Sequence, residues 1–439
     1  MCSGLPSDWT HSEIAQAGID VLDGDRGKEY PKESDFYSNE YCLFLSAKNV
    51  TKSGFRFSER LFITRNKDEK LRKGKLVRND IVITTRGTVG NVAFYDHGVP
   101  YENIRINSGM AIIRNTNGQV DSLYLNQLLH SPVVKEQVEL LAFGSAQPQL
   151  TIGLIKSLSI PRPPLPEQQK IAAILSSVDD VIEKTQAQID KLKDLKTGMM
   201  QELLSPQESS GQSKGIGHTE FKDSPVGRIP VGWDVRNLED VVERIIDCEH
   251  KTAPYVDKSE FLVVRTSNVR DGELIYDDMK YTSEQGFTEW TKRAVPSKGD
   301  VLFTREAPAG ESCMVPGENK LCMGQRMVLL RPKRDVIHPE FFSLFLTSEI
   351  AVLAIYELSI GTTVTRINIE DIKRIPCVVP SVKEQKEIAN AVRSVSTLVR
   401  KKQQKLDFLN SAKKALMQDL LTGKVRVNVD NQHKEEVVA

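Results

Sequence analysis

The feature that most constrains the fold of this chain is a long segment that occurs twice. Residues 166–205 align without a gap with residues 383–422, at an offset of 217 residues, so that Glu167-Gln168 falls on Glu384-Gln385. An internal repeat at a fixed offset indicates a duplicated structural unit. We therefore predict that the chain is one unit written twice, and that each copy is a globular part followed by a long helix.

The globular parts also align, although less closely than the long segments. Arg114 falls on Arg331 at the same offset of 217, and Asp80 falls on Asp300 at an offset of 220. Loop insertions shift an offset in this way. The two globular parts have diverged, whereas the two helices have kept a common role. Duplication by itself is compatible with any function.

The long segments carry apolar residues at alternating spacings of four and three, which is the heptad pattern of a coiled-coil seam. About 40 residues at about 1.5 Å per residue give a rod of roughly 60 Å. Chain order predicts that the two helices pair antiparallel and that the chain termini lie near each other. Two amphipathic helices in separate cores are the alternative. The predicted seam consists of Ile171, Leu175, Val178, Ile182, Ile189, Leu192, Met199, Ile388, Val392, Val395, Val399, Leu406, Leu409 and Leu416, with Thr185 and Lys402 as polar members.

The globular parts contain short apolar runs, such as residues 80–85 and 300–304, separated by Gly and Pro turn signals. Helical stretches follow at residues 122–141 and 339–358. This pattern predicts an α+β fold with two strand-rich domains separated by a long antiparallel two-helix coiled coil. The predicted boundaries are 1–160 for the first domain, 161–205 for the first helix, 206–225 for a linker, 226–375 for the second domain, 376–425 for the second helix and 426–439 for a flexible tail.

Loops beside the predicted strands are rich in hydrogen-bond donors. Arg pairs with guanine, Gln and Asn pair with adenine, and Lys, Ser and Thr bind phosphate, so such loops are candidates for DNA binding. Any one of these residues taken alone is more readily explained as part of an ordinary solvated loop. The case for DNA binding rests on the pattern appearing in both globular parts, with different side chains each time. The candidates are Lys73, Lys75, Arg78, Thr85, Arg86, Thr88, Asn91, Gln147, Gln149, Lys298, Arg305, Arg326, Thr363 and Arg366.

Composition and motifs exclude several classes of protein. Lys plus Arg equals Asp plus Glu at 59 each, but local patches rather than totals set phosphate contacts, so DNA binding remains open. The sequence has no phosphate-binding loop, no dinucleotide fingerprint, no HExxH and no GxSxG motif. Six scattered Cys residues without a CxxC pair argue against a metal site and for a reducing compartment. No signal peptide or membrane-spanning run is present, so we expect a cytoplasmic location.

Together these features resemble the specificity subunit of type I restriction-modification systems. The first helix opens Pro-Leu-Pro-Glu-Gln-Gln-Lys-Ile-Ala at residues 164–172, and the second opens Ser-Val-Lys-Glu-Gln-Lys-Glu-Ile-Ala at residues 381–389. Each globular part carries Pro-x-x-Trp near its start, and each helix ends in Leu-Leu-Ser or Leu-Leu-Thr-Gly. The second helix departs from the pattern at Val382-Lys383, where the first has Leu165-Pro166.

The resemblance implies that each globular part reads one half of a split, asymmetric site in double-stranded DNA and that the helices fix the gap. It also implies docking of two modification (methyltransferase) subunits and of restriction (translocase and nuclease) subunits. S-adenosylmethionine, ATP and Mg would then bind the partners, and this chain would carry no cofactor, metal or catalytic residue. The alternatives are a coiled-coil protein scaffold without specific DNA recognition, and a self-contained methyltransferase or nuclease.

Overall fold

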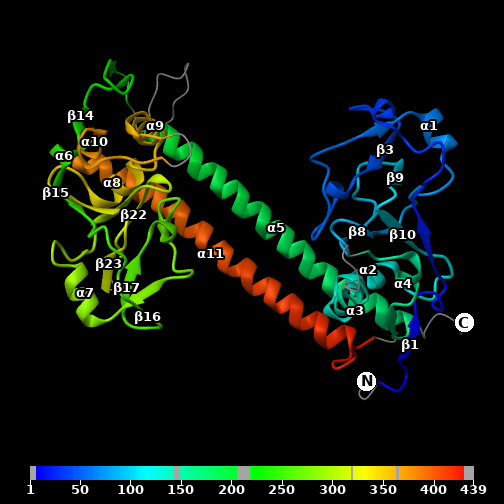
Figure 1. Cartoon of the computed structure of the whole chain (residues 1–439). Coiled ribbons are helices and arrows are strands. Elements are labelled where there is room, and N and C mark those ends of the chain that lie inside the picture. The colour runs from blue at the N-terminus through cyan, green and yellow to red at the C-terminus, as the bar shows by residue number, and fades with distance from the viewer. Residues whose placement is uncertain are drawn as a thin grey trace, which may run out of the picture. The chain divides into compact units, whose positions relative to one another are not determined.

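The computed structural model of the chain describes residues 6–142, 149–204, 218, 220–317, 320–361 and 365–429. The chain forms two compact units, and the first of them contains residues from both ends of the sequence. Unit 1 contains Met1–Gln186 together with Gln404–Ala439, and unit 2 contains Ala187–Gln403. Each unit therefore joins one globular part to half of each long helix (Figure 1).

Unit 1 is built on two small sheets. The larger sheet is antiparallel throughout, with the strand order β2 (Ile19–Asp23), β10 (Met110–Asn115), β7 (Ile81–Thr84) and β8 (Val92–Phe94). In the smaller sheet, β3 (Cys42–Leu45) lies antiparallel to β6 (Phe62–Ile63) and parallel to β9 (Ile104–Ile106). Two short pairs complete the strands, β1 (Thr10–Glu13) with β11 (Ser159–Arg162) and β4 (Val50–Thr51) with β5 (Gly54–Phe55).

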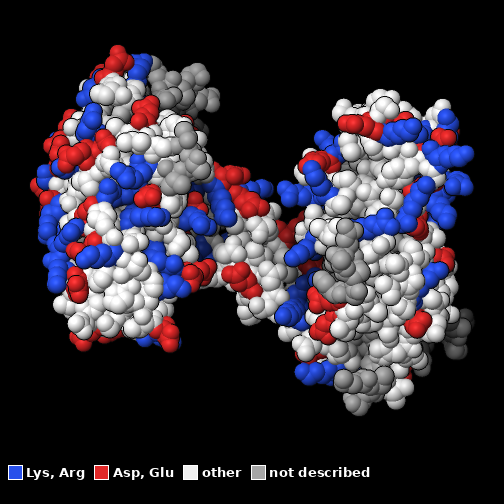
Figure 2. Space-filling model, in the orientation of Figure 1, with Lys and Arg blue, Asp and Glu red and all other residues white. Residues whose placement is uncertain are grey.

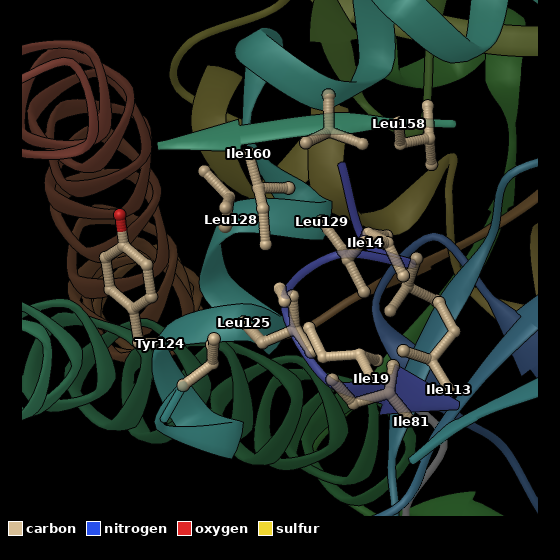
Figure 3. Close-up of a cluster of buried hydrophobic side chains, with 14 of the residues drawn as sticks. Ile14, Ile19, Ile81, Ile113, Tyr124, Leu125, Leu128, Leu129, Leu158 and Ile160 are labelled. Atoms are coloured by element: carbon tan, nitrogen blue, oxygen red, sulfur yellow. The ribbon is translucent and has the colours of Figure 1, made fainter. Parts of the chain in front are cut away.

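The larger sheet lies between two cores, because successive side chains of a strand point to opposite faces. Ile81 and Ile83 pack with the helices, whereas Val82 packs with the smaller sheet. Figure 3 shows the helical side of this arrangement, where Leu125 and Leu129 face Ile81. The helices of the globular part are α1 (Arg65–Lys70), α2 (Ser122–His130), α3 (Pro132–Ala142) and α4 (Ile152–Lys156), with 3-10 turns η1 (Glu33–Asp35) and η2 (Ala47–Asn49).

Unit 2 repeats this topology with one additional strand, β16 (Tyr255–Val256), in its smaller sheet. Its larger sheet has the order β15 (Val242–Asp247), β24 (Met327–Pro332), β21 (Val301–Arg305) and β22 (Ala309–Met314). Its smaller sheet has the order β16, β20 (Lys280–Thr282), β17 (Phe261–Val264) and β23 (Lys320–Met323), with β17 parallel to β23. The short pairs are β12 (Phe221–Lys222) with β13 (Ile229–Pro230), β14 (Asp234–Asn237) with β25 (Pro376–Val379), and β18 (Val269–Arg270) with β19 (Glu273–Leu274).

The remaining elements of unit 2 are α6 (Leu238–Val241), η3 (Thr266–Asn268), α7 (Glu284–Trp290), α8 (Pro339–Phe345), α9 (Glu349–Leu358) and α10 (Ile369–Lys373). The predicted α+β class and the internal repeat are therefore confirmed.

Among the described residues, no single helix is long and apolar enough to cross a membrane, and only α8 and α9 together, bent by 62°, meet that test of length and composition.

Each predicted helical stretch of the globular parts is broken into two helices. In unit 1 the break falls at Ser131, whose backbone is extended and whose N–H donates to the carbonyl of Leu128 at 3.0 Å. The residue before a proline disfavours the helical conformation, and Pro132 follows here. In unit 2, α9 starts anew because the hydroxyl of Ser348 accepts from the N–H of Ala351.

The long helices are α5 (Leu165–Leu204) and α11 (Val382–Leu421). In unit 1, Asp179 Oδ1 of α5 lies 2.5 Å from Lys413 Nζ of α11. In unit 2, Lys402 Nζ donates to Gln188 Oε1 at 2.7 Å. From the first of these pairs to the second, the residue number rises along α5 and falls along α11, so the two helices run antiparallel, as predicted.

The predicted seam residues are all buried or half-buried. Thr185, only 3% exposed, satisfies its hydroxyl by donating to the carbonyl of Val181 at 2.7 Å. By contrast, Leu195 and Phe408 lie off the seam and are 51% and 71% exposed. The helix ends also join the globular cores: Ile171 packs in the core of unit 1 and Leu204 in that of unit 2. The linker at 206–225 and the tail at 426–439 lie largely outside the described residues.

The described ends of the chain meet in unit 1, as chain order predicts. Both Nη atoms of Arg426 donate to the carboxylate of Asp8, at 2.9 and 2.8 Å. Arg426 also binds both carboxylate oxygens of Glu167 at 2.7 Å, and Glu167 Oε2 accepts from the indole of Trp9 at 3.0 Å. This cluster ties both chain ends to the start of α5.

Candidate nucleic-acid interface

The connection from β7 to β8 in unit 1 is a compact loop closed by Thr84. The hydroxyl of Thr84 accepts from the N–H of Asn91 at 3.0 Å and donates to the carbonyl of Thr88. The N–H of Gly90 donates to the carbonyl of Thr84 at 2.9 Å. The side chains of Arg86 and Thr88 are exposed on this loop.

The corresponding loop of unit 2 is closed in the same way. The hydroxyl of Thr304 donates to the carbonyl of Pro308 at 2.7 Å and accepts from the N–H of Glu311 at 2.9 Å. Two unlike loop sequences are therefore held by the same type of residue at the same place.

Two further segments pack beside each loop. In unit 1, the N–H of Thr85 donates to the carbonyl of Gly109 at 2.8 Å, and its carbonyl accepts from Leu150 at 3.0 Å. In unit 2, the N–H of Arg305 donates to the carbonyl of Arg326 at 2.8 Å, and the carbonyl of Arg305 accepts from the N–H of Ile367 at 2.9 Å. We call this surface the loop end of each unit: residues 85–91, 107–109 and 149–150 in unit 1, and residues 305–311, 324–326 and 365–367 in unit 2.

An ion pair with a buried carboxylate holds the opposite end of the same strand in each unit. Arg114 binds Asp80 through Nε and Nη2 at 2.8 and 2.7 Å, and Arg331 binds Asp300 through the same atoms at 3.0 and 2.7 Å. The bond to Asp80 raises the pKa of Arg114 against the effect of its burial. These bidentate pairs explain why both residues recur in the repeat.

Several candidate DNA-binding side chains are held within the protein. Lys75 pairs with the buried carboxylate of Asp68, and Asn91 donates to the carbonyl of Val50 at 3.0 Å. Arg78 binds Glu102 at 2.6 Å and lies over the ring of Tyr95, and Thr85 is only 4% exposed. We therefore assign these four side chains to building the domain rather than to contacting DNA.

Arg305 is also held from within, by the carboxylate of Asp247, a contact that sequence reasoning missed. Its Nη1 donates to Asp247 Oδ2 at 2.7 Å, and His250 Nε2 lies 2.9 Å from the same oxygen. Asp247, Cys248 and His250 offer metal-ligand atoms within 4.8 Å of one another. A guanidinium already neutralises Asp247, and its charge opposes a cation there. We therefore assign no metal to this cluster, which instead fixes the base of the second loop.

The remaining described candidates are exposed, and they fall into two groups at opposite ends of β7 and β21. Lys73 and Lys298 precede β7 and β21, whereas Arg86 and Arg326 lie at the loop ends that follow these strands. Gln149 and Arg366 also lie at the loop ends, beside Arg86 and Ile360 respectively. Gln147 and Thr363 lie outside the described residues.

The turn at 107–109 was missed by sequence reasoning, although Asn-Ser-Gly is a turn signal. Asn107 Oδ1 accepts from the N–H of Gly109 at 2.9 Å, and Arg26 Nη2 donates to the carbonyl of Ser108 at 3.3 Å. Arg26 reaches this turn from a distant part of the chain, which no local pattern reveals. Figure 2 shows basic and acidic side chains interspersed on the visible face of each unit, in keeping with the balanced composition.

Comparison with known families gives one consistent result. The family model described as type I restriction modification DNA specificity domain matches residues 6–194 and again residues 230–410. The type I restriction enzyme MjaVIII specificity subunit of Methanocaldococcus jannaschii is 26% identical, over 96% of this chain and 94% of that protein. The type I restriction enzyme EcoKI specificity subunit of Escherichia coli K12 is 22% identical, over 89% of this chain and 82% of that protein.

Solved structures show the same fold. The S subunit of a type I restriction-modification system from M. genitalium has a TM-score of 0.59 and 15% identity, over 95% of this chain and 98% of that chain. A second chain, from a structure described as the basis of complex assembly and conformational transition of the type I R-M system, has a TM-score of 0.52 and 16% identity. The match spans 96% of this chain and 100% of that chain.

Proposed function

The chain belongs to the family of type I restriction modification DNA specificity domains, and we propose that each of its units reads one half of an asymmetric, bipartite DNA sequence. One observation carries this proposal. The two loop ends share their backbone bonds but not their side chains: Arg86, Gly109 and Gln149 of unit 1 correspond to Glu306, Arg326 and Arg366 of unit 2.

Such a pair of surfaces suits a split site. Base edges in the major groove are distinguished by donors and acceptors, so different side chains on one frame select different bases. A symmetric frame with identical side chains would instead select two identical half-sites. The difference between the loop ends therefore supports an asymmetric sequence.

The chain acts in recognition rather than catalysis in this proposal. A coiled-coil scaffold without DNA recognition is not supported, because the matched family is one of DNA specificity domains. A self-contained methyltransferase is disfavoured because the sequence has no Asn-Pro-Pro-aromatic or Asp-Pro-Pro-aromatic tetrapeptide, which an amino-methyltransferase is expected to carry. A self-contained methyltransferase or nuclease also predicts turnover by the purified chain alone. The bound S-adenosylmethionine, ATP and Mg of the complex would belong to the partner subunits.

The long helices supply surfaces for two methyltransferase subunits. Val181 on α5 and Leu398 on α11 correspond at the repeat offset of 217, and both are exposed, at 40% and 48%. Exposed apolar residues at matched positions suit two copies of one partner. Restriction subunits would join the complex afterwards.

A cytoplasmic location fits this role, because the DNA and the partners are there. Cys42, Cys248, Cys313, Cys322 and Cys377 are free and buried, as in a reducing compartment. Burial raises the pKa of Cys313 and Cys322 to about 12, so these thiols are unreactive.

The proposal is tested by co-expressing the chain with its methyltransferase subunit and sequencing the host DNA for methylated adenine. We expect a motif of two short blocks around a fixed gap, absent when the methyltransferase is expressed alone. Replacing residues 6–160 with the matching domain of a relative should change one block only. A change in both blocks, or no motif from a stable complex, would contradict the proposal.

A further inference from the structure

Arg86 and Gln149 form a pair at the loop end of unit 1. The atoms of Arg86 that face Gln149 are both donors, so the amide of Gln149 presents its oxygen to them. In this orientation Nε and Nη2 of Arg86 donate to that oxygen at 3.1 and 3.0 Å. Both side chains are exposed to solvent.

The backbone beneath this pair is fixed. Thr85 precedes Arg86, and its N–H donates to the carbonyl of Gly109. The carbonyl of Thr85 accepts from the N–H of Leu150, which follows Gln149. Gly87 follows with a φ of 73°, a conformation that favours glycine, and turns the chain directly after Arg86. Arg86 and Gln149 are therefore brought together by main-chain bonds and not by chance contact of two long side chains.

Gln149 occupies only one edge of the guanidinium. Arginine has five N–H donors in a planar fork, and Gln149 takes one from Nε and one from Nη2. The second edge, formed by Nη1 and the other hydrogen of Nη2, bonds to no other group in the part of the chain that the structure describes. This edge offers two parallel N–H groups to a ligand.

We propose that Arg86 reads a guanine in the half-site of unit 1 and that Gln149 is the positioning residue that orients its guanidinium; this rests on the proposed DNA-reading function. Guanine presents O6 and N7 as two acceptors in the major groove, and a guanidinium edge matches both at once. Adenine presents a donor beside N7, so the same edge discriminates against it.

Unit 2 lacks this device at the corresponding place. Glu306 replaces Arg86 and Arg366 replaces Gln149, while the neighbouring Arg305 is held by Asp247 at 2.7 Å and is only 14% exposed. The guanine contact of Arg86 is therefore specific to the half-site of unit 1.

The test uses the complex of the full chain with its methyltransferase subunit. Arg86→Ala should abolish the preference for guanine at one position of one half-site, with a loss of about 5- to 150-fold in discrimination. The other half-site and the gap should not change. Gln149→Ala should weaken the same preference, and Gln149→Glu should retain it, because a carboxylate accepts the same two bonds. Lys70→Ala is the matched control, since Lys70 is exposed at the end of α1 in the same unit and is not a candidate DNA-binding residue.

A second measurement needs no variant. Duplexes in which each guanine of the motif is replaced in turn by 7-deazaguanine lose the N7 acceptor, and one replacement should weaken binding of the wild-type complex. If Arg86→Ala leaves every base preference intact, or no 7-deazaguanine weakens binding, the inference is wrong while the DNA-reading function stands. A wild-type complex that yields no motif overturns the proposed function and this inference together.

Discussion

The side-chain oxygen of Gln168 accepts a hydrogen bond from the backbone N–H of Asp121 at 2.8 Å. Gln385 makes the same bond to the N–H of His338 at 2.6 Å. Asp121 and His338 are the residues that precede α2 and α8, so each glutamine joins the start of a long helix to the start of a domain helix. The glutamine of the Glu-Gln pair that opens both long helices thus has a structural reason.

Gln168→Ala should destabilise unit 1. Gln168 is 1% exposed and also donates to the carbonyls of Pro163 and Gln119, at 2.9 and 3.3 Å. Removing it leaves buried groups without partners, which costs about 1–3 kcal/mol. Chemical unfolding followed by circular dichroism measures the change. Gln169→Ala, at the exposed neighbouring position, is the control, and an equal loss in both variants would contradict the assignment.

The helix seam and some of the strands could be predicted from the sequence, because they depend on patterns among neighbouring residues. The heptad spacing located the seam, and the apolar runs at residues 80–85 and 300–304 located β7 and β21, because burial imposes these periods on neighbouring residues. The repeat also singled out Asp80 and Arg114, which recur as Asp300 and Arg331 because each pair forms the same ion pair.

The sequence could not predict which basic residues remain free for a ligand. Arg305 and its partner Asp247 are 58 residues apart, and Arg78 binds Glu102, which lies 24 residues further along the chain. Such pairings arise only when distant segments pack together. The contact between Arg86 and Gln149 could not be predicted for the same reason, although both residues were candidates for DNA binding.

Asp68→Asn should destabilise unit 1 and remove part of its sensitivity to acid. Burial alone would raise the pKa of Asp68, but its bonds to Lys75 and Arg105 lower it overall. A lowered pKa means that this carboxylate stabilises the fold above its ordinary value near 3.8 and loses that contribution as the pH falls through the lower, folded value. Arg105 is 6% exposed and would lose its counter-charge, which costs about 3–5 kcal/mol.

The measurement is the free energy of unfolding at neutral pH and at pH values below the ordinary pKa of Asp68. The difference between the wild type and Asp68→Asn should shrink as the pH falls. Glu59→Gln is the control, because its pair with Lys48 is exposed on both sides, at 62% and 72%. A difference independent of pH would show that Asp68 does not act through its charge.

Gly310→Ala should impair the loop end of unit 2. Gly310 has a φ of 96°, and an added Cβ would lie 2.9 Å from Ile355 Cγ2 of α9. The backbone conformation alone costs an alanine about 1–2 kcal/mol. We expect weaker selection in the half-site of unit 2 and an unchanged half-site of unit 1, read from the methylation motif. Gly232→Ala, where an added Cβ meets open space, should change neither half-site, and an effect of Gly310→Ala confined to unit 1 would contradict the assignment.

A seven-residue insertion after Gln186 and another after Gln403 test whether the long helices set the gap. These positions correspond at the repeat offset, and seven residues preserve the heptad seam. Both helices lengthen by about 10 Å at about 1.5 Å per residue, which equals roughly three base pairs at about 3.4 Å each. The methylation motif should keep both half-sites and gain about three base pairs between them. An insertion in α5 alone should disrupt helix pairing and abolish methylation, and an unchanged gap with both insertions would show that the helices are not the ruler.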